Sequence, residues 1–92
     1  MNKLRIMKEK EIKLLANEAH VLQERLLDIE DYIWNNIKSE VKAKSSFGEY
    51  ASLVRIVFYP NFINVKVYDS GYDLYETEII KFTNEQLSEL MP

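Results

Sequence analysis

Residues 12–41, IKLLANEAHVLQERLLDIEDYIWNNIKSEV, decide how this chain folds. Apolar residues recur in this stretch with alternating gaps of three and four, which is the a/d pattern of a heptad repeat. No glycine or proline occurs before Gly48, so nothing local ends a helix there. The sequence therefore predicts one long helix over residues 1–46, with a self-association seam made of Ile12, Leu15, Ala19, Leu22, Leu26, Ile29 and Ile33.

A helix of this length does not fit inside a compact domain of 92 residues. At 1.5 Å per residue it is roughly 60 Å long, whereas such a domain has a diameter of about 30–35 Å. Either the helix breaks into a hairpin, for which Asn17 is a poor candidate, or its free part packs on another chain, which we favour. Leu14, Val21, Leu27 and Trp34 add apolar flanks, as expected of a helix that covers a sheet and also meets a partner. A single wide core face in a monomer is the alternative.

After Gly48 the hydrophobic period changes from that of a helix to two. Residues 50–59 are rich in β-branched and aromatic side chains on both faces, which is typical of a central strand. Residues 62–69 alternate, with Ile63, Val65 and Val67 on one face. Residues 72–82 form the third predicted strand, with a β-bulge near Glu76.

Thr83 and Gln86 have the spacing of a capping box, which predicts a short helix over residues 84–91. The expected fold is thus a single α+β domain over residues 1–92. It consists of a long N-terminal helix, a three-stranded antiparallel meander at 50–82 in order 1-2-3, and a short C-terminal helix.

Composition excludes several classes of function. The chain has no cysteine, which rules out disulfides, thiolate metal sites and thiol nucleophiles, and we expect a cytoplasmic protein. We expect neither a signal peptide nor a membrane span, because no apolar run is long enough. The net charge of −3 gives no overall attraction to nucleic acid or to anionic membranes.

The search for catalytic residues gives no candidate. His20 is the only histidine, and together with Glu24 it offers two metal ligands, which are too few for a site within one chain. The chain has only two glycines and therefore no glycine-rich phosphate loop, and no nucleophile elbow frames any serine. We expect no enzyme activity, no cofactor and no metal.

The hairpin between the second and third strands is the candidate surface for a macromolecular partner. Tyrosines give contact area at low entropic cost, and an acidic rim steers a basic partner. The candidate partner-binding residues are Tyr68, Asp69, Tyr72, Asp73, Tyr75, Glu76 and Glu78.

The sequence favours a non-enzymatic protein–protein interaction module that forms a homodimer through its long helix and binds an unidentified protein with its sheet. Antiparallel pairing about Leu22 is slightly preferred, because it sets Ala19 near Leu26. One alternative is a small inhibitor of a nucleic-acid-handling enzyme, of the phage or mobile-element type, acting through the acidic 69–78 hairpin. A weaker alternative is a single-stranded nucleic-acid binder that uses the sheet tyrosines. We rank nucleic acid below protein as the partner because the carboxylates outnumber their basic neighbours.

Overall fold

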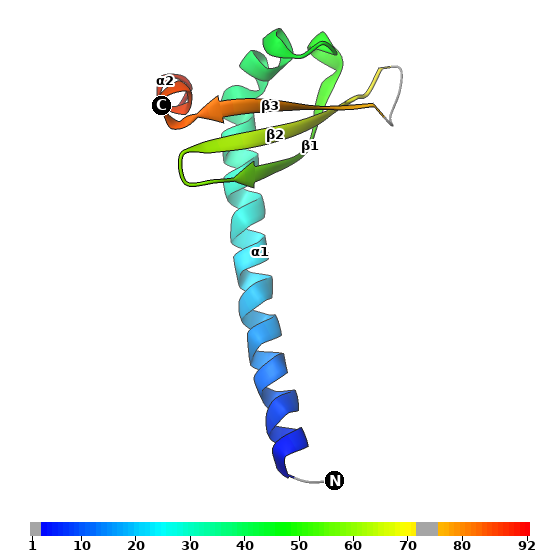
Figure 1. Cartoon of the computed structure of the whole chain (residues 1–92), viewed down its shortest axis with the longest axis vertical. Coiled ribbons are helices and arrows are strands. Elements are labelled where there is room, and N and C mark those ends of the chain that lie inside the picture. Colours follow the sequence, from blue (N-terminus) through cyan, green and yellow to red (C-terminus); the bar gives the residue numbers. More distant parts are fainter. Residues whose placement is uncertain (1–2, 72–75) are drawn as a thin grey trace.

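The computed structural model of the chain describes residues 3–71 and 76–92, with side chains from residue 8 onward. Its elements are helix α1 (Lys3–Lys44), the 3-10 turn η1 (Gly48–Tyr50), strands β1 (Ala51–Phe58), β2 (Phe62–Asp69) and β3 (Thr77–Thr83), and helix α2 (Asn84–Leu90). The strands form one antiparallel sheet in order β1-β2-β3 (Figure 1). The predicted α+β architecture is confirmed.

Helix α1 runs without a break past Asn17, so the hairpin alternative is excluded. The sheet and α2 lie at its C-terminal end, and the rest of α1 projects from them as a rod (Figure 1). We call residues 8–29 the stalk, because every one of them is exposed. The described part of the molecule measures 59 × 32 × 18 Å, so the long dimension is set by α1.

The core lies between the last turns of α1 and one face of the sheet, the inner face. Ile37 and Val41 are the buried residues that α1 contributes. They pack with buried side chains of all three strands, namely Ala51, Ile56, Ile63, Val65, Val67 and Phe82. The expected alternation of β2 is confirmed, since Ile63, Val65 and Val67 are buried and their neighbours are half-buried. The opposite face, the outer face, is covered by no element of the described chain.

Strand β1 lies at an edge of the sheet, as the predicted order 1-2-3 requires, so the interpretation of residues 50–59 as a central strand is wrong. Its pairing with β2 shifts between Leu53 and Arg55, which leaves Val54 as a bulge with 44% of its surface exposed. The bulge changes the alternation so that Leu53 and Ile56 both point to the inner face, opposite Val67 and Val65. The apolar residues that suggested a strand buried on both faces therefore reflect a bulge in an edge strand.

Strand β3 is described from Thr77 to Thr83, and the position of the expected bulge near Glu76 adjoins residues outside the described part of the chain. The pairing of β2 with β3 runs without a register shift from Phe62 opposite Thr83 to Tyr68 opposite Thr77. Residues 72–75 of the predicted strand lie outside the described residues. Among the strand pairs that the structure describes, the register shift lies in β1.

The ends of the two helices follow the expected local chemistry. Gly48 has φ of +58°, a left-handed conformation that L-residues rarely adopt, soon after α1 ends at Lys44. At the start of α2 the backbone N–H of Gln86 donates to the Thr83 side chain at 3.3 Å, and the N–H of Thr83 donates to the Gln86 side chain at 2.8 Å. This confirms the predicted capping box.

Candidate functional site

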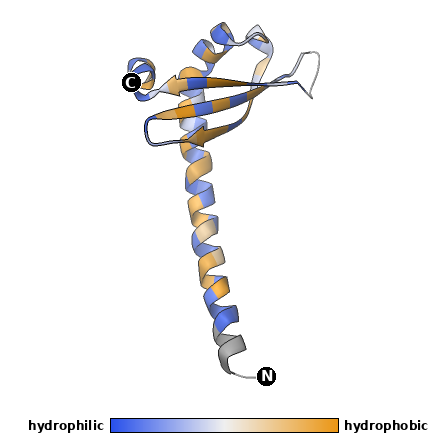
Figure 2. Ribbon diagram, in the orientation of Figure 1, coloured by the Kyte–Doolittle hydropathy of each residue, from blue (hydrophilic) through white to orange (hydrophobic). Residues whose placement is uncertain are grey.

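The stalk exposes a row of large apolar side chains. Leu15, Leu22 and Leu26 of the predicted seam are 57%, 60% and 47% exposed. Ile12 and Ile29 of the seam are exposed as well, as are the flanking residues Leu14, Val21 and Leu27. Figure 2 shows these apolar positions as patches that recur along the stalk below the sheet. Isolated apolar residues are common on protein surfaces, but a contiguous row of this length indicates an interaction surface.

The seam is divided between the stalk and the core of the same chain. Ile33 and its neighbour Trp34 are half-buried and pack against the core cluster. Ile29, one turn earlier, is 40% exposed. The part of the seam that has no partner within the described chain therefore ends at Ile29.

A carboxylate of α1, one residue beyond the stalk, contacts the edge strand of the sheet. Glu30 accepts a hydrogen bond of 2.9 Å from the backbone N–H of Ile56 in β1. Because β1 pairs only with β2, the backbone N–H groups of β1 that point away from β2 would be free to pair with another strand. Glu30 satisfies this donor and opposes further strand addition at that point.

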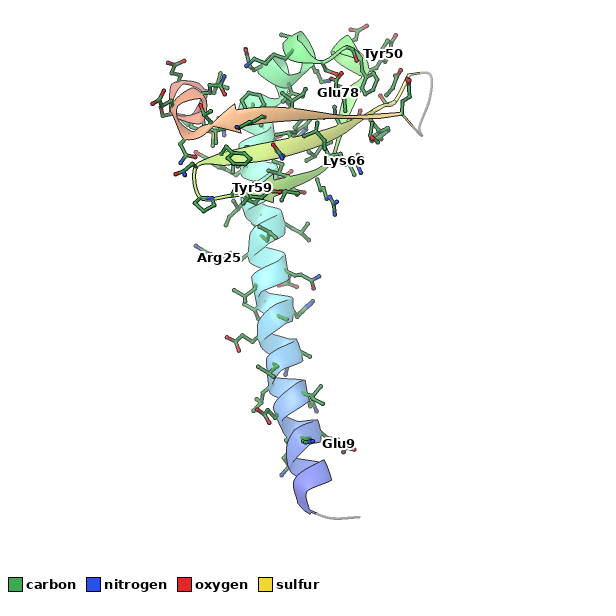
Figure 3. All side chains as sticks on the ribbon, in the orientation of Figure 1. Glu9, Arg25, Tyr50, Tyr59, Lys66 and Glu78 are labelled. Atoms are coloured by element: carbon green, nitrogen blue, oxygen red, sulfur yellow. The ribbon has the colours of Figure 1, made fainter. Side chains whose placement is uncertain are left out.

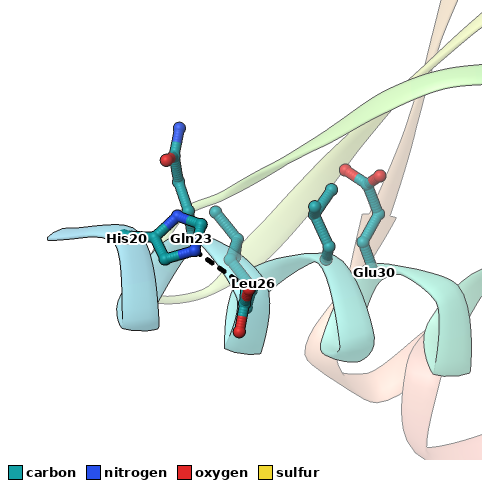
Figure 4. Close-up of a pocket in the computed structure, with 6 residues that line it drawn as sticks. His20, Gln23, Leu26 and Glu30 are labelled. Atoms are coloured by element: carbon teal, nitrogen blue, oxygen red, sulfur yellow. Dashed lines mark ion pairs between the residues drawn. The ribbon is translucent and has the colours of Figure 1, made fainter. Parts of the chain in front are cut away.

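The hollow beside Glu30 is a shallow feature of the helix surface. It has a volume of about 360 Å³ and is lined by α1 residues alone, including His20, Gln23, Leu26 and Glu30 (Figure 4). Inside it His20 Nε2 lies 3.1 Å from Glu24 Oε1, and both side chains are about two-thirds exposed. Residues 8–71 and 76–92 contain no group of three side chains able to hold a metal ion. The hollow offers a mainly apolar contact surface.

Two carboxylates of the acidic hairpin are engaged in holding the fold. Asp69 is only 8% exposed, and its Oδ1 accepts from the backbone N–H of Gly71 at 2.9 Å. Glu78 lies on the inner-face side of β3, opposite Val67, and reaches the end of α1 (Figure 3). Its carboxylate accepts from Ser46 Oγ at 2.6 Å and from Ser46 N–H at 3.2 Å. The Ser46 hydroxyl holds the pKa of Glu78 below its usual value, against a smaller opposing effect of burial.

The remaining predicted partner-binding residues do not form one described cluster. Tyr68 is half-buried on the outer face, between Ser52 and Thr77 on the neighbouring strands. Glu76 is exposed just before β3, and its carbonyl accepts from the N–H of Asp69 at 3.4 Å. Tyr72, Asp73 and Tyr75 lie outside the described residues.

Sequence reasoning named the cations of the sheet but missed that they share the outer face without the carboxylates of the strands. Arg55 and Lys66 lie directly opposite each other on β1 and β2. Lys81 of β3 lies on the same face, opposite Asn64. The signal was present in the sequence, because the alternation that buries Val65 and Val67 turns Lys66 outward and Asp69 inward. The sequence-based prediction counted Asp69 and Glu78 against these cations, although both carboxylates belong to the inner-face side.

Comparison with protein-family models, with curated proteins and with solved structures finds no match for this chain. Among the described residues, no helix has the length and hydropathy needed to cross a membrane. The surfaces themselves are therefore the basis for a functional assignment.

Proposed function

We propose that this protein is a non-enzymatic interaction module that forms a homodimer through its stalk and offers its sheet to a macromolecular partner. The observation that carries the proposal is the exposed apolar row of the stalk, which continues into the protein's own core at Ile33. An exposed apolar helix face of this kind supports either self-association or the binding of another protein. The heptad spacing favours a second copy, because a matching seam is then available by symmetry.

The energetics of an isolated helix also favour a partner. The stalk makes no tertiary contact that buries its side chains, so it would depend on helix propensity alone. In proteins most of the stability of a helix comes from tertiary packing of its apolar face rather than from helix propensity. Packing the apolar row against a second copy supplies the missing burial, at roughly 25 cal/mol per Å² of apolar surface.

The exposed part of the seam favours antiparallel pairing in one particular register. Because Ile33 packs on its own core, the free seam extends from Ile12 to Ile29 and its midpoint falls between His20 and Val21. Antiparallel pairing about that midpoint places every seam residue of one copy opposite a seam residue of the other. The pairs are Ile12 with Ile29, Leu15 with Leu26, and Ala19 with Leu22.

Charge along the stalk supports the same orientation. Residues 24–31 carry a net charge of −3, from one arginine and four carboxylates. Parallel pairing would set this segment beside its own copy, whereas the antiparallel register sets it beside residues 10–17, whose net charge is +1. The register also brings Glu18 of one copy beside Arg25 of the other, at positions that flank the seam, and does so twice by symmetry.

Inhibition of a nucleic-acid-handling enzyme by charge mimicry has less support than self-association. It needs the carboxylates of the hairpin to be available to a target, and those of Asp69 and Glu78 accept hydrogen bonds within the chain. The main proposal includes the expectation that the protein is not an enzyme.

The test of the proposed function is the solution mass, measured by light scattering across a concentration series. We expect the mass of a dimer, and we expect Leu22→Glu to give a monomer of lower stability. Asn17→Glu is the matched control, since it adds the same charge to the exposed side of the stalk that faces away from the seam, and it should remain dimeric. A monomeric wild-type protein, or an unchanged dimer mass for Leu22→Glu, would refute the assignment of the seam.

A further inference from the structure

We propose that the outer face of the sheet binds single-stranded nucleic acid. The inference rests on the proposed function only in taking the sheet as the surface offered to a partner. It does not require the dimer. It names the chemical class of that partner from the distribution of charge and aromatic rings on the face.

The sheet separates charges of opposite sign onto its two sides. The whole chain has a net charge of −3, yet the described residues of the outer face carry three cations and no carboxylate. Asp69 and Glu78 belong to the inner-face side, opposite Ala51 and Val67. The outer face comprises Ser52, Arg55, Val57, Phe62, Asn64, Lys66, Tyr68, Thr77, Ile79, Lys81 and Thr83. Its local potential is therefore positive although the protein is acidic.

The three cations lie close together on neighbouring strands of the outer face. Arg55 and Lys66 are directly opposite residues of neighbouring strands, and like charges in that arrangement destabilise a sheet. Lys81 is one diagonal step from Lys66 across β2 and β3. None of the three forms an ion pair with another described residue. The repulsion between these cations lowers the stability of the free protein, and a bound anion would remove that repulsion. Such a cluster is typical of a site that binds repeated negative charge.

Aromatic rings accompany these cations, which distinguishes a nucleic acid from other polyanions. The rings of Tyr59 and Phe62 stack with centroids 4.6 Å apart and an angle of 16°. Lys81 Nζ lies 4.4 Å from the centroid of the same Phe62 ring. Tyr59 is 45% exposed at the turn that leads into β2, and Lys66 lies nearer the middle of that strand (Figure 3). Exposed rings beside a basic sheet are the means by which sheet-based domains stack unpaired bases.

Other occupants explain fewer of these features. A second copy packed face to face would bring three cations against three cations. An acidic protein segment would satisfy Arg55, Lys66 and Lys81 but has no use for an exposed Tyr59 ring. Double-stranded nucleic acid presents its phosphates with the bases already stacked, so the rings would again have no partner.

The test is fluorescence anisotropy with a labelled oligothymidylate and a labelled oligouridylate of about 20 nucleotides, longer than the 4–16 nucleotides that one single-strand-binding domain covers. At about 50 mM salt we expect saturable binding, with a slope of log K against log salt of about −2 for three phosphate contacts. Arg55→Glu should weaken binding at least tenfold. This variant makes an opposite-charge pair with Lys66, so it is expected to fold at least as well as the wild type.

Two further variants complete the experiment. Lys38→Glu is the matched control: it makes the same charge change at an exposed position of α1 and should bind as the wild type does. Tyr59→Ala should weaken oligonucleotide binding about fivefold or more through lost stacking. Polyglutamate, the probe for an acidic protein segment, should compete poorly.

The inference is overturned if neither oligonucleotide binds, if Arg55→Glu binds like the wild type, or if polyglutamate competes as well as the oligonucleotides and Tyr59→Ala has no effect. Light scattering on the same samples keeps this result apart from the proposed function. A dimer that binds no oligonucleotide contradicts only the present inference. A monomer that binds with the expected dependence on Arg55 supports it and contradicts only the proposed dimer.

Discussion

The carboxylate of Glu30 lies 2.9 Å from the backbone nitrogen of Ile56, so a side chain of α1 satisfies a backbone donor on the free side of β1. This contact ties β1 to α1 beside the point where the stalk ends. It also occupies a donor that would otherwise be open to a strand of another molecule.

Replacing Glu30 tests this contact. Glu30→Ala should lower the free energy of unfolding by about 1–2 kcal/mol, because a partly buried N–H loses a charge-assisted acceptor. The measurement is urea unfolding at one fixed protein concentration, since dimerisation contributes to apparent stability. Glu24→Ala is the control: its contact with His20 is exposed, and its loss should change stability by less than about 0.5 kcal/mol. Equal stabilities of the two variants would mean that the Ile56 N–H does not depend on Glu30.

Cysteine cross-linking tests the antiparallel register. Because the chain has no native cysteine, the introduced cysteine is the only thiol that can form a disulfide. The register sets position 12 of one copy beside position 29 of the other, whereas the two positions 12 are roughly 25 Å apart at 1.5 Å per residue. Under mild oxidation, a mixture of Ile12→Cys and Ile29→Cys chains should give the mixed cross-linked dimer, with little product from either variant alone. Efficient cross-linking of Ile12→Cys to itself would indicate a parallel dimer.

The hydrogen bonds from Ser46 to Glu78 predict a specific dependence of stability on pH. They favour the charged carboxylate and lower the pKa of Glu78 from its usual value of 4.5, so the folded state binds fewer protons than the unfolded state just below that pH. The contribution of Glu78 is therefore fully present above about pH 4.5 and is lost as the pH falls through the folded-state pKa.

Glu78→Gln should accordingly reduce stability at pH 7 by about 1 kcal/mol, a modest figure because the site is solvent-accessible. It should also lose less stability than the wild type on acidification below about pH 4.5. Urea unfolding between pH 7 and pH 3 measures both effects. Glu76→Gln is the comparison, because it removes the same charge from an exposed carboxylate that does not contact Ser46. A wild-type profile for Glu78→Gln at low pH would rule out the proposed linkage.

Much of the fold could be predicted because local signals agree with it. The heptad spacing, the absence of glycine before Gly48, the alternation around Val65 and the capping box at Thr83 each specify one element. The strand order 1-2-3 was predicted correctly, but residues 50–59 were misinterpreted as a central strand, because the bulge at Val54 imitates a strand that is apolar on both faces. From local sequence alone, a strand with a bulge looks the same as a strand whose two faces are both buried.

The candidate surfaces could be predicted only in part. Exposure along the stalk followed from length alone, because a long helix exceeds the size of its own domain. The sides on which the charges of the sheet lie depend on strand register. Glu78 belongs to the acidic hairpin by sequence, but the pairing of β3 with β2 turns it toward Ser46. The cations at 55, 66 and 81 are far apart in sequence and become neighbours only when three strands align.

The unbroken course of α1 has a further consequence for the antiparallel dimer. Ile37 marks where each sheet is anchored, and in the proposed register the two copies of this residue are separated by a rise of on the order of 50 Å. A single stiff rod would hold the two sheets at that spacing, with no flexible linker between them. The dimer would then discriminate ligands by length. A ligand long enough to contact both sheets at once gains avidity, whereas a shorter ligand binds each sheet independently.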